Sequence, residues 1–189
     1  MQALRQPLEQ GSVSITRSSG TVAYPCRFML VAATNPCPCG WAGDAARACR
    51  CSPAAVDAYQ RALSGPLLDR IDLNVTVPRP PLEALGREPQ AESTAVVRAR
   101  VLEARVRQHA RQAGLNGSLR VAELRRHAAL DPPARRALER WASERGLTAR
   151  GFHRAWRVAR TVADLAGQER VAEEHVLEAL GYRLFERAA

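Results

Sequence analysis

An arginine between two aspartates is the first candidate for chemistry in this sequence. Arg70 lies directly after Asp69 and two residues before Asp72. A Ser-Gly-Pro break at 64–66 and an apolar turn precede it, and a strand is expected over 71–77. A guanidinium held rigidly at a domain edge can reach a phosphate on a neighbouring molecule. The alternative interpretation is a local salt bridge between Arg70 and one of the two aspartates.

The chain has no residue that could complete a phosphate-binding loop. All 28 basic residues are arginine, and none is lysine. A loop of the G-x-x-x-x-G-K-[ST] type needs its lysine on the β- and γ-phosphates. The sequence therefore offers an arginine for nucleotide chemistry but no loop that holds the nucleotide, and we expect the chain alone not to hydrolyse ATP.

Two close pairs of cysteines form a second candidate site. Cys37 and Cys39 are separated by one residue, as are Cys49 and Cys51, and nine residues lie between the pairs. Four thiolates on one loop can hold a structural zinc ion in tetrahedral geometry. The C-x-C spacing is tighter than usual, so plain reduced thiols are the alternative. Cys26 is interpreted as an ordinary buried thiol.

Composition favours an acidic partner such as nucleic acid. The 189 residues carry a net charge of +9, and residues 91–189 alone hold 19 arginines against 12 acidic residues. The alternative interpretation is that a GC-rich genome encodes arginine in place of lysine and that these arginines lie on solvated helix faces. The sequence has no apolar run of roughly 20 residues and no apolar segment near Met1. We therefore expect a cytoplasmic protein without a membrane partner.

The first half of the chain predicts an α/β arrangement. A short helix over 4–9 ends at Gly11, and a β-hairpin follows over 12–24. The apolar run 28–33 predicts a strand buried on both faces, and Ser52-Pro53 predicts the start of a helix over 54–63. Asn35 then lies at the carboxyl end of the buried strand, where ligands bind in such sheets; a turn residue before Pro36 is the alternative.

The second half predicts a small helical bundle. The predicted helices cover about 92–112, 121–129, 132–145, 149–166 and 172–180, after a linker at 81–90. In the first of them, the expected core-facing residues are Ala95, Ala99, Leu102 and Val106.

Three stretches, 34–40, 64–72 and 148–165, resemble the ComM/YifB family of magnesium-chelatase-like AAA+ ATPases. The resemblance implies an α/β plus all-α fold. Residues 1–80 would form the C-terminal part of a P-loop AAA+ core, a partial sheet with a β-hairpin insertion, and residues 91–189 a helical-bundle lid. In the family, the phosphate loop and the acidic magnesium-binding motif lie upstream of the part matched here, so the chain looks truncated at its start.

The resemblance also implies roles for individual residues. Asn35 matches the first sensor, which positions the attacking water, and Arg70 matches the arginine finger, which reaches the nucleotide of the adjacent subunit. Arg150 matches the second sensor on the lid, and Arg154, one turn on, is the alternative for that role. The implied cofactor is ATP with Mg²⁺.

The implied function is a hexameric, ATP-driven DNA motor that promotes branch migration in natural transformation and recombination. Arg17, Ser18 and Ser19 at the hairpin tip would contact the nucleic-acid backbone, although a charged tip also serves solubility. Two other functions remain open: the ATPase subunit of a magnesium chelatase, and a non-catalytic, basic helical fragment that binds DNA.

Overall fold

The computed structural model describes residues 4–18, 20–63, 70–80, 86 and 91–183, and the chain forms two units, Met1–Ile71 and Asp72–Ala189. Ser19, the break and apolar turn before Arg70, and most of the expected linker at 81–90 lie outside the described residues. Within the described residues, no helix has the length and apolar character needed to cross a membrane.

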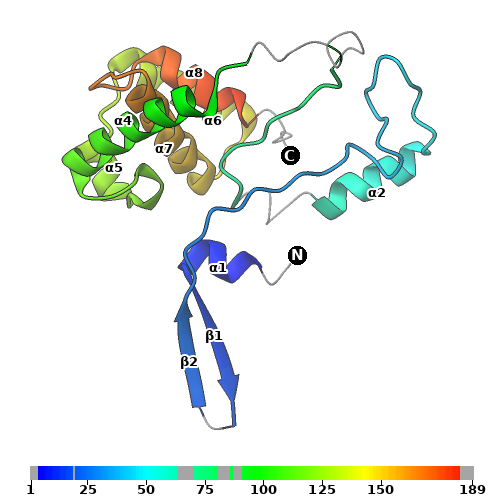
Figure 1. The fold of residues 1–189 in the computed structure, drawn as a ribbon, viewed down its shortest axis with the longest axis horizontal. Coiled ribbons are helices and arrows are strands. Elements are labelled where there is room, and N and C mark those ends of the chain that lie inside the picture. Colours follow the sequence, from blue (N-terminus) through cyan, green and yellow to red (C-terminus); the bar gives the residue numbers. More distant parts are fainter. Residues whose placement is uncertain (1–3, 19, 64–69, 81–85, 87–90, 184–189) are drawn as a thin grey trace. The chain divides into compact units, whose positions relative to one another are not determined.

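The first unit begins with the predicted helix and hairpin (Figure 1). Helix α1 (Arg5–Gln10) ends at Gly11, whose φ of 62° lies in the left-handed region that favours glycine. Strands β1 (Ser12–Arg17) and β2 (Gly20–Pro25) pair antiparallel, from Ser12 opposite Pro25 to Arg17 opposite Gly20. The predicted helix and hairpin are thus confirmed. Both were predictable because they depend on local sequence alone.

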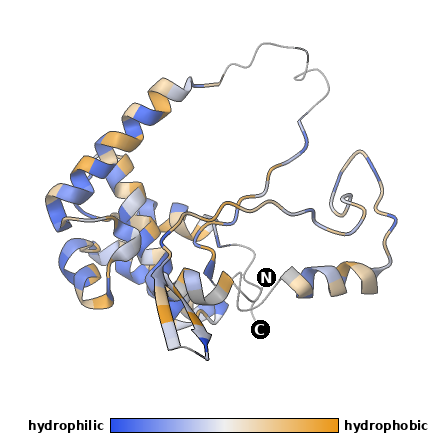
Figure 2. Ribbon diagram, turned by 60° about the horizontal axis from the view of Figure 1, so that its bottom comes forward, coloured by the Kyte–Doolittle hydropathy of each residue, from blue (hydrophilic) through white to orange (hydrophobic). Residues whose placement is uncertain are grey.

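The two other predicted strands are wrong. Residues 28–33 and 71–77 are extended but belong to no strand, and their apolar side chains are open to water: Met29 is 86% exposed and Val77 83%. Figure 2 shows apolar residues along parts of the chain that form neither a helix nor a strand. A strand needs a neighbour to satisfy its backbone groups, and the only described strands, β1 and β2, pair with each other. The fold is therefore a two-stranded sheet with helices, consistent with part of an α/β arrangement.

Helix α2 (Pro53–Leu63) begins where the Ser-Pro pair predicts. The Ala55 N–H donates to Oγ of Ser52 at 3.3 Å, which satisfies one of the backbone groups left open at a helix start. This helix follows directly on the second cysteine pair.

The second unit is the predicted helical bundle, with helices α4 (Thr94–Gln112), α5 (Val121–His127), α6 (Pro132–Arg145), α7 (Ala149–Leu165) and α8 (Glu173–Gly181). Helix α7 packs against each of the four other helices (Figure 1). Thr148 caps α7 as predicted, accepting from the Gly151 N–H at 3.1 Å. The core consists of buried alanines with larger residues such as Leu124, Leu138 and Trp156, and the Trp156 indole N–H donates to the Ala128 carbonyl at 2.7 Å.

The predicted buried stripe of α4 is wrong. Leu102 and Val106 are 49% and 68% exposed, and the residues buried in this helix are Ala104 and Gln108. The reason is that the buried face of α4 serves a polar network rather than an apolar seam, so apolar periodicity points to the wrong side of the helix.

Asp164 of α7 is the centre of that network and is fully buried. Its carboxylate accepts two hydrogen bonds from Arg111 at 2.7 and 2.8 Å, one from Arg160 at 2.9 Å and one from Asn116 at 2.7 Å. The Asn116 N–H in turn donates to Oε1 of Gln108 at 2.9 Å. Buried charges are tolerated where they are paired and hydrogen-bonded in this way.

Removing the charge of Asp164 should destabilise the bundle strongly. Asp164→Asn leaves the buried Arg160 guanidinium without its countercharge, which typically costs about 3–5 kcal/mol. Urea unfolding followed by helical circular dichroism at neutral pH measures the loss. Glu92→Ala, which breaks an exposed ion pair with Arg100, is the control and should have a much smaller effect; equal losses would contradict a central role for Asp164.

The same carboxylate predicts a pH dependence. Burial raises the pKa of Asp164, but hydrogen bonds from Arg111 and Asn116 and the charge of Arg160 outweigh it and hold the pKa below its ordinary value. The stability that Asp164 contributes is therefore present above the ordinary pKa and is lost as the pH falls through the lowered one. The difference between the parent and Asp164→Asn should shrink accordingly in acid.

Candidate functional site

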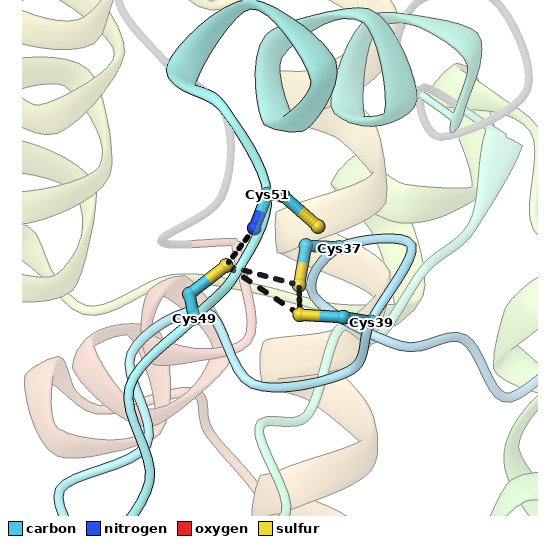
Figure 3. A group of neighbouring side chains, drawn as sticks. All are labelled: Cys37, Cys39, Cys49 and Cys51. Carbon is cyan, nitrogen blue, oxygen red and sulfur yellow. Dashed lines mark hydrogen bonds between the residues drawn. The ribbon is translucent and has the colours of Figure 1, made fainter.

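The four predicted cysteines converge in the first unit. The Sγ atom of Cys37 lies 3.4 Å from that of Cys39 and 3.7 Å from that of Cys49, and Cys39 and Cys49 are 3.6 Å apart. With Cys51, all four sulfur atoms lie within 4.8 Å of one another. Figure 3 shows the sulfur atoms directed toward a common centre from two parts of one loop.

These distances fit a tetrahedral metal site. Zn–S bonds of about 2.3 Å place the four sulfurs of a regular tetrahedron about 3.8 Å apart, close to the separations found here. A disulfide would need sulfurs at about 2.05 Å, and all four thiols are free. The arrangement is therefore that of a Cys₄ site rather than of two disulfides, and it could hold a metal.

The electrostatics of the cluster favour a bound cation. Backbone N–H groups of Arg50 and Trp41 lower the pKa of Cys39 to about 6. The Cys51 N–H lowers the pKa of Cys49, but burial and the neighbouring sulfurs outweigh it and raise it to about 12. Four thiolates so close together repel one another, and a divalent cation removes that repulsion.

Two glycines shape the loop that carries these cysteines. Gly40 and Gly43 have φ angles of 83° and 81°, in the left-handed region that other residues rarely adopt. Between the cysteine pairs, Oδ1 of Asp44 accepts from the N–H groups of Ala46 and Arg47, both at 2.8 Å. The loop can therefore turn sharply enough to bring one pair of cysteines back onto the other.

Asn35 lies beside the cysteine cluster. Its side chain is exposed, and a methyl group added at Gly40 would lie 3.8 Å from Cγ of Asn35. The preceding residue, Thr34, shares a hydrogen bond of 3.2 Å with the Tyr59 hydroxyl of α2. Sequence reasoning did not identify Tyr59, because nothing local signals a contact across 25 residues.

The three arginines predicted to act on the nucleotide differ in their exposure to solvent. Arg70 is half-buried at the end of the first unit, and Arg150 is exposed on the first turn of α7. Arg154 is only 13% exposed and its guanidinium bonds the Asp72 carboxylate at 2.9 Å. The structure thus brings Asn35 to the cysteines and Asp72 to Arg154. Asn35 and Arg70 belong to the first unit, and Arg150 and Arg154 to the second.

Two of the three residues predicted at the hairpin tip lie within the described residues. Arg17 and Ser18 are exposed at the end of the hairpin, and the hydroxyls of Thr16 and Thr21 share a hydrogen bond of 3.0 Å just behind the turn. The tip is therefore accessible to a partner, while Ser19 lies outside the described residues.

Comparison with known proteins gives matches over both halves of the chain. Residues 1–85 match the model of magnesium chelatase, subunit ChlI, and residues 91–183 match that of its C-terminal region. The chain is 40% identical to the competence protein ComM of Haemophilus influenzae and 38% identical to YifB of Salmonella typhimurium, over 99% of its length in both cases. The chain belongs to the magnesium-chelatase-like ComM/YifB family. YifB of Escherichia coli is also similar to the chain, with 39% identity over 99% of its length.

The match to the ComM/YifB relatives covers only part of those proteins. The chain corresponds to 36% of the length of the H. influenzae ComM relative and to 37% of each of the two YifB relatives. The two family models meet between residues 85 and 91, near the expected linker at 81–90. The division into a core part, a linker and a lid stays a prediction.

Proposed function

We propose that this chain is the arginine-finger and lid part of an ATP-driven DNA motor that works in the cytoplasm as a ring of six identical subunits. The observation that carries the proposal is the match to ComM along 99% of the chain, which includes the segments around Asn35, Arg70 and Arg150. A competence protein is the kind of relative expected for a motor that acts on incoming DNA.

In this proposal the active site forms between subunits. Asn35 orients a water molecule against the terminal phosphate of ATP and Mg²⁺ held by its own subunit. Arg70 reaches the nucleotide of the next subunit, where a permanently charged, planar guanidinium stabilises charge that builds on phosphate oxygens. Arg150, which is exposed on the first turn of α7, acts as the second sensor, and Arg154 is the alternative for that role.

We further propose that the cysteine cluster holds a structural zinc ion. The donor set is four sulfurs with separations close to those of a zinc tetrahedron, which fits this metal better than the oxygen-seeking Mg²⁺. Reduced thiols are the normal state of cysteine in the cytoplasm, so all four are available as ligands.

The hairpin tip is the proposed DNA contact, and Arg17→Ala tests it. Each arginine that neutralises one DNA phosphate contributes about one unit to the slope of log affinity against log salt concentration. We expect Arg17→Ala to weaken binding of duplex DNA and to reduce that slope by about one, as measured by fluorescence anisotropy at several salt concentrations.

The matched control for that measurement is Arg140→Ala, which removes an exposed arginine from α6 of the second unit. It should leave the slope unchanged. If Arg17→Ala leaves affinity and slope untouched while Arg140→Ala reduces both, DNA binding belongs to the basic helical unit and the hairpin contact is refuted.

The ATPase subunit of a magnesium chelatase is the second candidate, favoured by the matched family models, whose descriptions name that enzyme. The two functions differ in what stimulates ATP turnover. Turnover that rises with branched DNA supports the motor, and turnover that rises only with porphyrin and its partner subunits supports the chelatase.

A further inference from the structure

Among the described residues of the first unit, the cysteine cluster contains the one buried side chain. Among the described residues of that unit, Cys37 alone is fully buried, and the apolar cluster that forms a core belongs entirely to the second unit. A segment without an apolar core needs another source of order, such as a metal ion. We therefore expect the four thiols, with a bound metal, to provide the order that a hydrophobic core provides in other proteins.

Around this cluster the chain closes a loop between Asn35 and helix α2. Cys37 lies two residues after Asn35, and Cys51 immediately precedes Ser52, which caps α2. A metal bound to both pairs would therefore join the Asn35 segment to the first turn of the helix.

Two hydrogen bonds repeat this attachment further along α2. The hydroxyls of Thr34 and Tyr59 lie 3.2 Å apart, and the Gln60 side-chain amide donates to the Pro36 carbonyl at 3.4 Å. Both bonds are exposed and compete with water, so they fix the direction of α2 only weakly. The sulfur ligands would supply the strong connection.

We propose that the metal held by the four cysteines positions Asn35 relative to α2, the helix that leads toward Arg70. The tight turn at Gly40, where an added methyl group would lie 3.8 Å from Cγ of Asn35, belongs to the metal-binding loop and abuts the Asn35 side chain. Loss of the metal releases both Asn35 and α2 while the helical unit stays folded. This inference rests on the proposed zinc site and on the role proposed for Asn35.

The experiment uses the 189-residue chain labelled with ¹⁵N, in its zinc-loaded and chelated forms. The side-chain amide signals of Asn35 report its position, and amide hydrogen exchange reports the order of α2. On zinc removal we expect the Asn35 signals to shift and exchange in residues 53–60 to become at least about tenfold faster. Signals from α7 should not change, which shows that the second unit remains folded.

Three variants separate positioning from general disruption. Cys49→Ser should reproduce the metal-free form, and Cys49→His, which offers zinc a nitrogen ligand, should restore both zinc and the Asn35 signals. Cys26→Ser, outside the cluster, should behave as the parent. Tyr59→Phe should keep zinc and change the Asn35 signals far less than zinc removal does, because it removes only the weak hydrogen bond to Thr34.

The outcomes are distinguishable. If zinc binds but the Asn35 signals and α2 exchange do not respond to its removal, the positioning proposal is overturned and the zinc site stands. If neither zinc nor cadmium binds in any form, the proposed metal site fails, and the positioning proposal fails with it. Neither result decides whether the protein is a DNA motor.

Discussion

Arg70→Ala is expected to lower ATP turnover by a factor of about 10³–10⁵ and to leave ATP affinity within a few-fold of the parent. The test needs a phosphate loop. A suitable extended protein joins this chain to the upstream part of the H. influenzae ComM relative, where the family resemblance places that loop. In the proposed role, Arg70 acts only on charge that develops during phosphoryl transfer, so its loss should appear in kcat and not in nucleotide binding.

Two variants make the result specific. Arg70→Lys should remain defective, because a compact ammonium group does not reproduce the planar fork of donors of a guanidinium. Arg140→Ala, an exposed arginine of α6, should hydrolyse ATP as the parent does. Turnover by Arg70→Ala within about threefold of the parent would show that Arg70 only makes a local salt bridge.

Removing the metal is the second change with a large expected effect. The purified chain should contain about one zinc ion, held by four sulfurs at about 2.3 Å in X-ray absorption spectra. Cys49→Ser should lose that zinc and the order of the loop between the cysteine pairs, because the first unit has no apolar core among its described residues to replace it.

The zinc site should also weaken in acid. The thiols must lose their protons to bind metal, and the raised pKa of Cys49, about 12 without metal, means that binding at neutral pH releases a proton. Zinc affinity should therefore fall as the pH falls, measured by competition with a chromophoric chelator. A content below about 0.2 zinc per chain in protein purified without chelators would contradict the site.

The helices and the hairpin were predictable because their signals are local. Gly11 and Thr148 mark a helix end and a helix start within a few residues of the turn they control. The convergence of the four cysteines was predictable for the same reason, since the two C-x-C pairs lie on one loop and glycines allow it to fold back.

The errors came where structure depends on distant partners. The apolar run 28–33 has strand composition, but a strand forms only beside another strand, and none of the described residues supplies one. In α4, apolar spacing placed Leu102 and Val106 inside, whereas the buried face carries Gln108 and leads to Asp164. Polar burial of this kind leaves no periodic apolar signal.

The contact between Asp72 and Arg154 could not be found from sequence either, because 82 residues separate the pair. A second contact supports it: the Asn74 N–H donates to the Tyr182 carbonyl at 2.9 Å. Both contacts attach the residues just after Arg70 to the helical unit, a connection that no spacing rule indicates.

The central claim is that Arg70 acts on the nucleotide of a neighbouring subunit, and a mixing experiment tests it most directly. Extended protein carrying Arg70→Ala is mixed with extended protein whose phosphate loop is disabled, each inactive alone. If Arg70 works across the interface, mixed rings contain complete sites and ATP turnover reappears in the mixture. A mixture that forms rings but stays as inactive as its components would contradict the proposal.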